Sequence, residues 1–259
     1  MAAEQLAAWL DSYRADLRSA LACAAQQGYR AVQANAAGDE LDPREFGDSA
    51  RRHLRKYLSN LGLQLDSVAV DYAGLGLADP TRANQRVDRL RQTLELCADL
   101  GVRRAGVRLG GFEDAATAPL AGELLGVVAD LANRYGIAAA VHSPDSTPDA
   151  SAARIRVLAC PQLRMALDTA WPLTTPGGIA GVADLVEVAY LRDVRRSGDQ
   201  YEEVPFGTGD VDLAGLLAGL AGGACDAALV VRHDAEGGVD ALRQGREYMR
   251  SLIGRFGPR

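Results

Sequence analysis

The chain of 259 residues is poor in several residue types on which particular chemistries depend. Lys56 is the only lysine and lies in the charged segment RRHLRKYL, so Schiff-base chemistry, which needs a lysine amine, is set aside. The four cysteines (Cys23, Cys97, Cys160 and Cys225) stand singly, without metal-ligand spacing, and we expect buried, reduced thiols. No glycine run fits GxGxxG, so no dinucleotide site is indicated.

Long apolar runs and an excess of positive charge are also missing. No apolar run reaches the roughly 18 residues that a membrane span needs. The segment MAAEQLAAWLDSYR carries Glu4 and Asp11 where a signal peptide would be basic. The net charge of -6 and the pI near 5.2 argue against a nucleic-acid partner. We therefore expect a soluble cytoplasmic protein that acts on a small molecule and binds neither nucleic acid nor membranes.

Strand and helix patterns alternate along the whole chain, and 48% of the residues are hydrophobic, enough for one sizeable core. The segment 6–11 fits a first strand and a helix equally well. Asp42-Pro43 and Asp79-Pro80 each predict a helix start, an acidic N-cap followed by proline. Eight strand–helix units predict an α/β fold, a (β/α)8 TIM barrel in one domain over 1–259. The other strands are expected at 31–36, 63–71, 104–111, 136–143, 163–169, 185–191 and 227–234, and the helices at 14–27, 42–62, 79–101, 116–135, 149–159, 211–220 and 239–254.

Polar residues end four of these strands, at the face of such a barrel where chemistry is carried out. Asp168 ends a buried strand, which is costly unless something binds the carboxylate. The other three ends are His142, the run from Tyr190 to Asp193, and the run from Arg232 to Asp234. The long polar segment 194–210 is expected to be a functional loop.

Each candidate residue has a functional and a structural interpretation. His142 is suited to proton transfer near neutral pH, but a histidine at a strand end can also cap the following turn. Strand alternation places Arg232 and Asp234 on one face and turns His233 toward the barrel wall. Arg108 and Arg192 could hold an anionic group, although Arg192 also fits a solvated surface position.

The glycine-rich run 207–210 (GTGD) has two interpretations as well. Its backbone amides could hold an oxyanion at the start of the next helix. Asp210 argues against a phosphate there and favours a loop and N-cap role.

From about Leu17 to Leu252 the sequence resembles the sugar phosphate isomerase/epimerase superfamily, the xylose-isomerase-like TIM barrels. The similar segments, in order, are ALACAAQQGYRAVQ, LGLQLDSVAV, LELCADLGVRRAGVRLGG, GIAAAVHS, LDTAW, YLRD, VPFGTGDVDLAGLLAGL and LVVRHD. VPFGTGDVD is the most specific of them, and the order and spacing of all of them support the fold.

The resemblance implies one divalent metal (Mn, Mg or Zn), held by a Glu, an Asp, a His and a Glu that end strands five to eight. These positions are His142, Asp168, Tyr190 and Arg232 here, and a second family histidine is replaced by Trp171. A guanidinium at the last position would repel a divalent ion, and we expect it to form a forked pair with Asp168 instead. We therefore expect no cofactor; a metal, if bound, would use His142 and Asp168.

Two functions remain open. The first is a sugar isomerase or epimerase of carbohydrate metabolism, acting on a polyhydroxylated and possibly anionic molecule. In it His142 and Asp168 transfer protons and Arg232 replaces the metal as electrophile. The second is a catalytically silent homologue that serves as a ligand-binding or partner subunit. A metal-dependent endonuclease of the same superfamily is opposed by the ligand set and the net charge, and a homodimer is expected only by family analogy. The expected substrate-binding residues are Arg108, Trp171, Tyr190, Asp193, His233 and Asp234.

Overall fold

Eight parallel strands close into a barrel in the computed structural model, which describes residues 6–38, 41–170, 179–197, 200–222 and 226–256. Around the barrel the strand order is β1-β10-β7-β6-β5-β4-β3-β2, so the last strand pairs with the first. This confirms the predicted (β/α)8 barrel. The strands are β1 (Leu6–Trp9), β2 (Ala31–Asn35), β3 (Gln64–Val70), β4 (Arg104–Arg108), β5 (Ala138–His142), β6 (Leu163–Asp168), β7 (Val186–Leu191) and β10 (Ala228–Val231).

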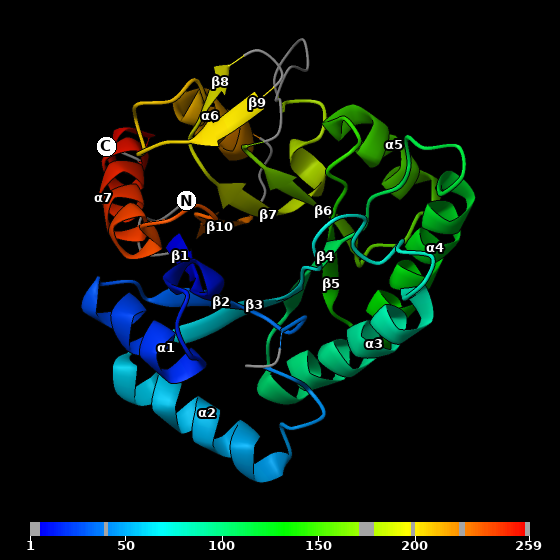
Figure 1. Ribbon diagram of the computed structural model, residues 1–259, viewed down its shortest axis with the longest axis horizontal. Coiled ribbons are helices and arrows are strands. Elements are labelled where there is room, and N and C mark those ends of the chain that lie inside the picture. The colour runs from blue at the N-terminus through cyan, green and yellow to red at the C-terminus, as the bar shows by residue number, and fades with distance from the viewer. Residues whose placement is uncertain (1–5, 39–40, 171–178, 198–199, 223–225, 257–259) are drawn as a thin grey trace.

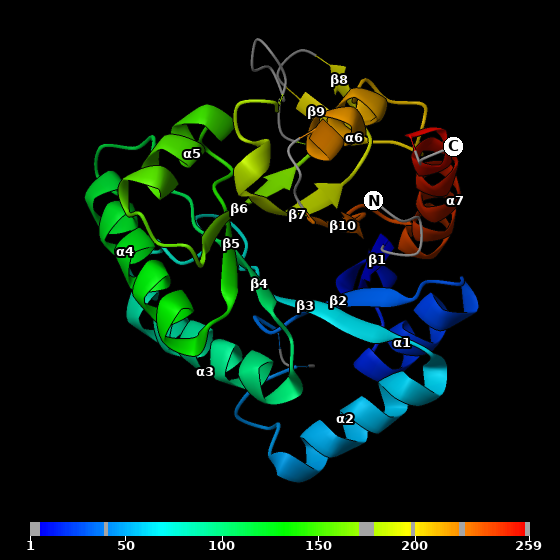
Figure 2. The same ribbon diagram turned by 180° about the vertical axis from the view of Figure 1, so that it is seen from behind.

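The helices form an outer ring around the strands in both views (Figure 1; Figure 2). Gly62, Gly101 and Gly136 end three of them with positive φ angles of 65°, 75° and 66°, a backbone conformation that glycine adopts without strain. The helices are α1 (Leu17–Gln26), α2 (Asp48–Leu61), α3 (Ala83–Leu100), α4 (Ala118–Tyr135), α5 (Pro148–Val157), α6 (Leu213–Gly222) and α7 (Gly238–Phe256), with 3-10 turns at Leu10–Tyr13 and Ala183–Leu185. Within the described ranges, no helix is long and apolar enough to cross a membrane.

The ambiguous segment near the start of the chain is a strand, β1. It pairs in parallel with β2 on one side and β10 on the other, and all four of its residues are buried. Ala7 and Trp9 face the barrel interior, while Leu6 and Ala8 pack in the layer between strands and helices. Tertiary pairing on both edges therefore decides between two conformations that the local sequence allows equally.

Two predicted helix starts are wrong, because each acid makes other hydrogen bonds. Asp42 accepts from the backbone N–H and the guanidinium of Arg44, and α2 begins only at Asp48. Asp79 accepts from the N–H and hydroxyl of Thr81 in a tight turn, and α3 begins at Ala83.

The segment expected to be one polar loop contains an antiparallel hairpin. Its strands are β8 (Val194–Ser197) and β9 (Gln200–Glu203), which lie beside α6 in both views (Figure 1; Figure 2). The hairpin follows β7 and so stands at the end of the barrel where the strands finish.

Small residues line most of the barrel interior, with two large aromatic side chains near its carboxyl end. A Cβ on Gly106 would come within 2.4 Å of the Tyr190 hydroxyl, so glycine makes room for the phenol. The Trp9 and Tyr190 rings meet edge to face with centroids 6.1 Å apart. The buried interior cluster is Ala7, Trp9, Ala31, Ala69, Ala140, Ala166, Val188, Tyr190, Ala228 and Val230.

Candidate active site

The polar strand ends converge at the carboxyl end of the barrel, which we call the mouth. Its ionic and polar side chains follow five different strands. They are Asp71 after β3, His142 on β5, Asp168 on β6, Tyr190 and Arg192 on or after β7, and Arg232 and Asp234 after β10.

Arg232 is the central cation of the mouth. Its Nε and Nη2 donate to Asp234 at 2.9–3.1 Å, and its Nη1 donates to Asp71 at 2.5 Å. The guanidinium carbon lies 4.7 Å from the centroid of the Trp9 ring and 5.3 Å from that of Tyr190. Burial opposes the charge, but the two carboxylates outweigh it and raise the pKa of Arg232.

The expected forked pair between Arg232 and Asp168 is wrong, because Arg192 binds Asp168 instead. Arg192 Nη1 lies 3.1 Å from Asp168 Oδ2, and the Asp168 side chain is only 5% exposed. Burial would raise the pKa of Asp168, but the nearby charge of Arg192 and other cationic groups lowers it overall. The solvated position allowed for Arg192 is also wrong, since its side chain is 16% exposed and bound to carboxylates.

Glu203, a residue that sequence reasoning missed, ties the hairpin to the mouth. Its Oε1 accepts from Arg192 Nε at 2.6 Å. Its Oε2 accepts from the backbone N–H groups of Asp234 and Ala235 at 2.8 and 2.6 Å. Only the length of the polar segment pointed to this part of the chain, and nothing in it singled out one acid.

His142 is a neutral imidazole without a partner for one ring nitrogen. The residue is 7% exposed, and its Nδ1 is buried with no hydrogen-bond partner among the described residues. Burial lowers the pKa of His142 to about 4, although the charge of Asp168 opposes this. Its ring centroid lies 6.2 Å from that of Tyr190, whose pKa burial raises. The mouth therefore contains an uncharged nitrogen base next to a phenol that stays protonated.

Asp193, expected to bind substrate, is instead turned toward the loop 207–210. Its Oδ2 accepts from the backbone N–H groups of Gly207 and Gly209 at 2.7 and 3.1 Å. The amides proposed to hold an oxyanion thus hold this carboxylate of the chain. Asp210 accepts from the Arg196 N–H at 2.8 Å, in line with a loop role for this run.

The remaining predicted substrate-binding residues have separate positions. Arg108 donates to the carbonyl oxygen of Gly74 at 3.1 Å and its Nη1 lies 3.8 Å from Asp71. His233 Nε2 lies 3.1 Å from the carbonyl oxygen of Glu236, and its Nδ1 lies 3.7 Å from Glu203 Oε2. Trp171 lies outside the described residues.

The residues at the mouth do not fit the divalent metal that the family resemblance implies. The guanidinium of Arg232 stands at the last ligand position, and Tyr190 replaces the histidine. Two ligand-type side chains, His142 and Asp168, remain from that set, and Asp168 is bound to Arg192. Over the described ranges no group of three His, Cys, Asp or Glu side chains is placed to hold an ion.

Solved structures with the same fold cover almost the whole chain. A xylose isomerase domain protein from Planctomyces limnophilus has a TM-score of 0.80 and 19% identity, with 96% of each chain covered. A xylose isomerase-like TIM barrel protein from Mycobacterium smegmatis, in complex with magnesium, has a TM-score of 0.76 and 15% identity, with 92% of this chain and 88% of that chain covered. An L-ribulose 3-epimerase has a TM-score of 0.75 and 16% identity, with 96% and 94% covered.

These identities are low enough that the likeness shows the fold alone. No curated protein matches the sequence. The model of the xylose isomerase-like TIM barrel family matches residues 21–252. The chain therefore belongs to the xylose isomerase-like TIM barrel family.

Proposed function

We propose that the chain is an isomerase or epimerase of a ketose-like, polyhydroxylated small molecule, and that it works at the mouth without a divalent metal. The observation that carries the proposal is the buried, neutral His142 with its unpartnered Nδ1. Leaving a buried polar atom without a partner costs free energy, so such an atom is a candidate for contact with a ligand.

The reaction begins when His142 takes a proton from the carbon next to the substrate carbonyl. The electron pair of the broken C–H bond forms the C=C bond of an enediolate, and the former carbonyl oxygen gains the negative charge. Return of the proton to the neighbouring, former carbonyl carbon gives the isomer when the hydroxyl proton of the first carbon passes to the charged oxygen. Protonation of the first carbon on its opposite face by solvent water gives the epimer, and the proton held by His142 neutralises the hydroxide left behind. Asp168 is bound to Arg192, whereas His142 Nδ1 has no partner among the described residues, so the imidazole is the group that can take the proton.

Arg232 supplies the positive charge that the enediolate oxygen needs. A guanidinium has about five N–H donors, and the bonds to Asp71 and Asp234 engage Nε, Nη1 and Nη2 once each. Donors remain on the two terminal nitrogens for an oxyanion, and the two carboxylates fix the group in place before substrate binds. Protonated His142 is then stabilised by the nearby charge of Asp168.

Deuterium exchange tests this proposal. The protein is incubated in D2O with a panel of ketoses that includes L-ribulose, once with EDTA and once with manganese, and the C–H signals are followed by proton NMR. We expect exchange next to the carbonyl in EDTA, and a loss of about 100-fold or more in His142→Gln. The matched control, His53→Gln, changes an exposed histidine on α2 and should keep the full rate. Exchange that needs manganese would contradict the metal-free mechanism.

The silent homologue is the second candidate, favoured by a different observation. Both mouth arginines are already bound to carboxylates of the chain, Arg232 to Asp71 and Asp234, and Arg192 to Asp168 and Glu203. A mouth neutralised in this way would bind a neutral polyol without reaction. No exchange with any ketose of the panel, together with saturable binding of one of them, would favour this alternative.

A further inference from the structure

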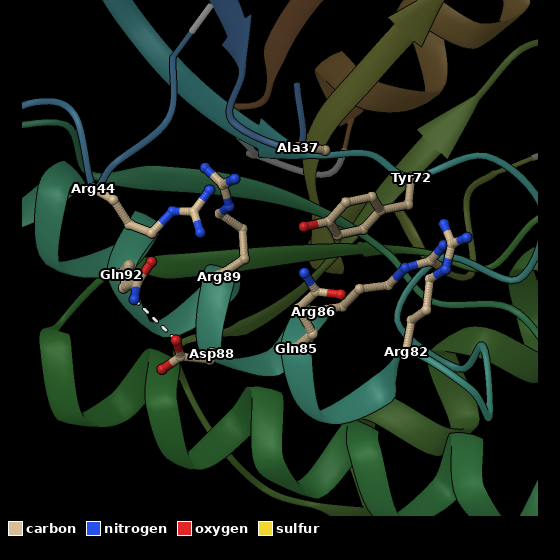
Figure 3. A pocket seen from close by; sticks show the side chains of 9 residues that line it. All are labelled: Ala37, Arg44, Tyr72, Arg82, Gln85, Arg86, Asp88, Arg89 and Gln92. Carbon is tan, nitrogen blue, oxygen red and sulfur yellow. Dashed lines mark hydrogen bonds between the residues drawn. The ribbon is translucent and has the colours of Figure 1, made fainter. Parts of the chain in front are cut away.

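A cavity with an arginine-rich lining lies outside the mouth, beside the first half of α3. Its volume is about 200 Å³. Ala37 follows β2, Tyr72 follows β3, and most of the other lining residues belong to α3, so the cavity opens near the end of the barrel where the strands finish. We call it the α3 pocket; Figure 3 shows its lining, which is Ala37, Arg44, Tyr72, Arg82, Gln85, Arg86, Asp88, Arg89 and Gln92.

Four arginines approach Tyr72 from two directions. In the view of Figure 3, Arg44 and Arg89 lie to one side of the phenol and Arg82 and Arg86 to the other. The guanidinium carbon of Arg86 lies 4.5 Å from the centroid of the Tyr72 ring.

Carboxylates outside the lining hold three of the four arginines in place. Asp42, which is not a lining residue, binds both Arg44 and Arg89, and hydrogen bonds from Arg44 hold the pKa of Asp42 well below its usual range. Arg86, 9% exposed in its side chain, binds Asp79 at 3.2 Å and donates to the carbonyl oxygen of Gly76.

The charge of the lining is not balanced. Asp88 is its one acid, and it accepts from Arg91 and Gln92 at 2.9 Å. Arg82 is exposed, and over the described ranges it forms no salt bridge. Excess positive charge therefore remains around the phenol and the Gln85 amide.

We propose that the α3 pocket binds a phosphate group, either free orthophosphate or the phosphate of a small ester. Several guanidinium forks directed at one space match the multiple oxygens and the double charge of phosphate better than they match a single carboxylate. The Tyr72 hydroxyl and the Gln85 amide add neutral donors. The cavity accommodates a small anion and part of an attached group, and the proposal does not rest on the function proposed for the mouth.

The pocket also has a physical connection to the mouth. Tyr72 follows Asp71, which binds Arg232. The loop after Tyr72 is held from both directions, by Arg86 at Gly76 and by Arg108 at Gly74. The segment from Asp71 to Gly76 therefore connects the α3 pocket with the mouth.

Isothermal titration with orthophosphate and, separately, with glycerol phosphate tests the proposal on the full chain. We expect saturable binding of one anion per chain, weakened about tenfold or more in Arg82→Gln, because one charged hydrogen-bonding group is lost. Arg243→Gln removes the same charge from an exposed arginine on α7, paired with Asp240, and should bind like the wild type. A second pair of variants adds a charge: Gln85→Glu in the pocket should weaken binding similarly, and Gln244→Glu on the exposed face of α7 should not.

Each outcome decides the proposal. Equal affinity for the two probes identifies the phosphate group alone as the ligand, and tighter binding of the ester shows that the pocket also contacts the organic part. No saturation by either probe up to about 10 mM would overturn the proposal. Saturable binding that Arg82→Gln and Gln85→Glu leave unchanged would overturn it as well, because the anion would then bind elsewhere.

Discussion

Ionic clusters close both ends of the barrel, but they are built differently. At the opposite end, where strands begin, Arg104 lies 3.5 Å from Asp66 and 3.2 Å from Glu187, and Arg164 lies 3.6 Å from Glu187. These side chains are 18–27% exposed. At the mouth the shortest contacts of Arg232 and Arg192 are 2.5 and 2.6 Å, to carboxylates 8–10% exposed.

The two ends also shift carboxyl pKa values in opposite directions. Burial raises the pKa of Asp66, because the charge of Arg104 compensates only in part. Asp168 is more deeply buried, yet Arg192 and the other cationic groups lower its pKa. Attraction between charges thus outweighs burial for Asp168, and burial outweighs attraction for Asp66. Within the part of the chain that the structure describes, the mouth combines buried ion pairs with a neutral imidazole, which is why we place the chemistry there.

The largest effect is expected from removing the central cation. Arg232→Met removes the cation that pairs with Asp71, whose side chain is 10% exposed, and with the exposed Asp234. Because the charge of Asp71 is then left buried, the change should lower the free energy of unfolding by about 3–5 kcal/mol. Arg164→Met at the opposite end breaks one long, partly exposed pair and should cost about 1 kcal/mol or less. Urea denaturation measures both; equal losses would remove the distinction between the two ends.

The second largest effect is a pH dependence of stability that is caused by His142 at the mouth. Folded His142 takes up a proton near pH 4, whereas in the unfolded chain it does so near its ordinary value of 6.5. Between these pH values the unfolded chain binds more protons. Stability is therefore complete above 6.5 and falls as the pH drops to about 4, by about 3 kcal/mol in all.

Urea denaturation of the wild type, His142→Gln and His53→Gln over this pH range measures the effect. The loss should disappear in His142→Gln and persist in His53→Gln. A pH dependence that is the same in all three proteins would assign it to other groups.

A smaller effect is expected from the contact between β4 and β7. Gly106→Ala places a methyl group within 2.4 Å of the Tyr190 hydroxyl and should cost about 2 kcal/mol, because the ring must move. Tyr190→Phe removes the hydroxyl and should recover most of this cost when the two changes are combined. A double-mutant cycle by thermal denaturation measures the coupling, and additive losses would show that this contact does not limit the packing.

The smallest effect on the free energy of unfolding is expected from replacing Asp66 and Asp168 in turn. At neutral pH Asp66→Asn should raise the free energy of unfolding by about 1 kcal/mol or less, since the folded state disfavours the charged form, whereas Asp168→Asn should lower it. For Asp66 the favourable effect of protonation is complete below the unfolded pKa and is lost as the pH rises through the raised folded pKa. The same sign for both variants in urea denaturation would contradict the comparison.

The barrel was predictable from the sequence because apolar strand patterns and glycine helix ends are local features. Asp168, His142 and Arg232 were found at the mouth because each directly ends a strand. Their partners were not predictable: Arg232 was expected to bind Asp168, but the three-dimensional structure places Arg192 on that carboxylate. Glu203 is far from the strand ends in sequence and reaches the mouth through hairpin pairing, for which the segment 194–210 carries no clear signal.

Whether the mouth holds a neutral base is tested most directly by NMR titration of the histidine ring signals. The three histidines give few signals, and the one absent from His142→Gln belongs to His142. We expect this ring to stay neutral on acidification until about pH 4 and to remain a neutral acceptor throughout the physiological range. A midpoint at or above the ordinary value of 6.5 would show that the imidazole is solvated or paired, and would contradict its role as the buried base of the mouth.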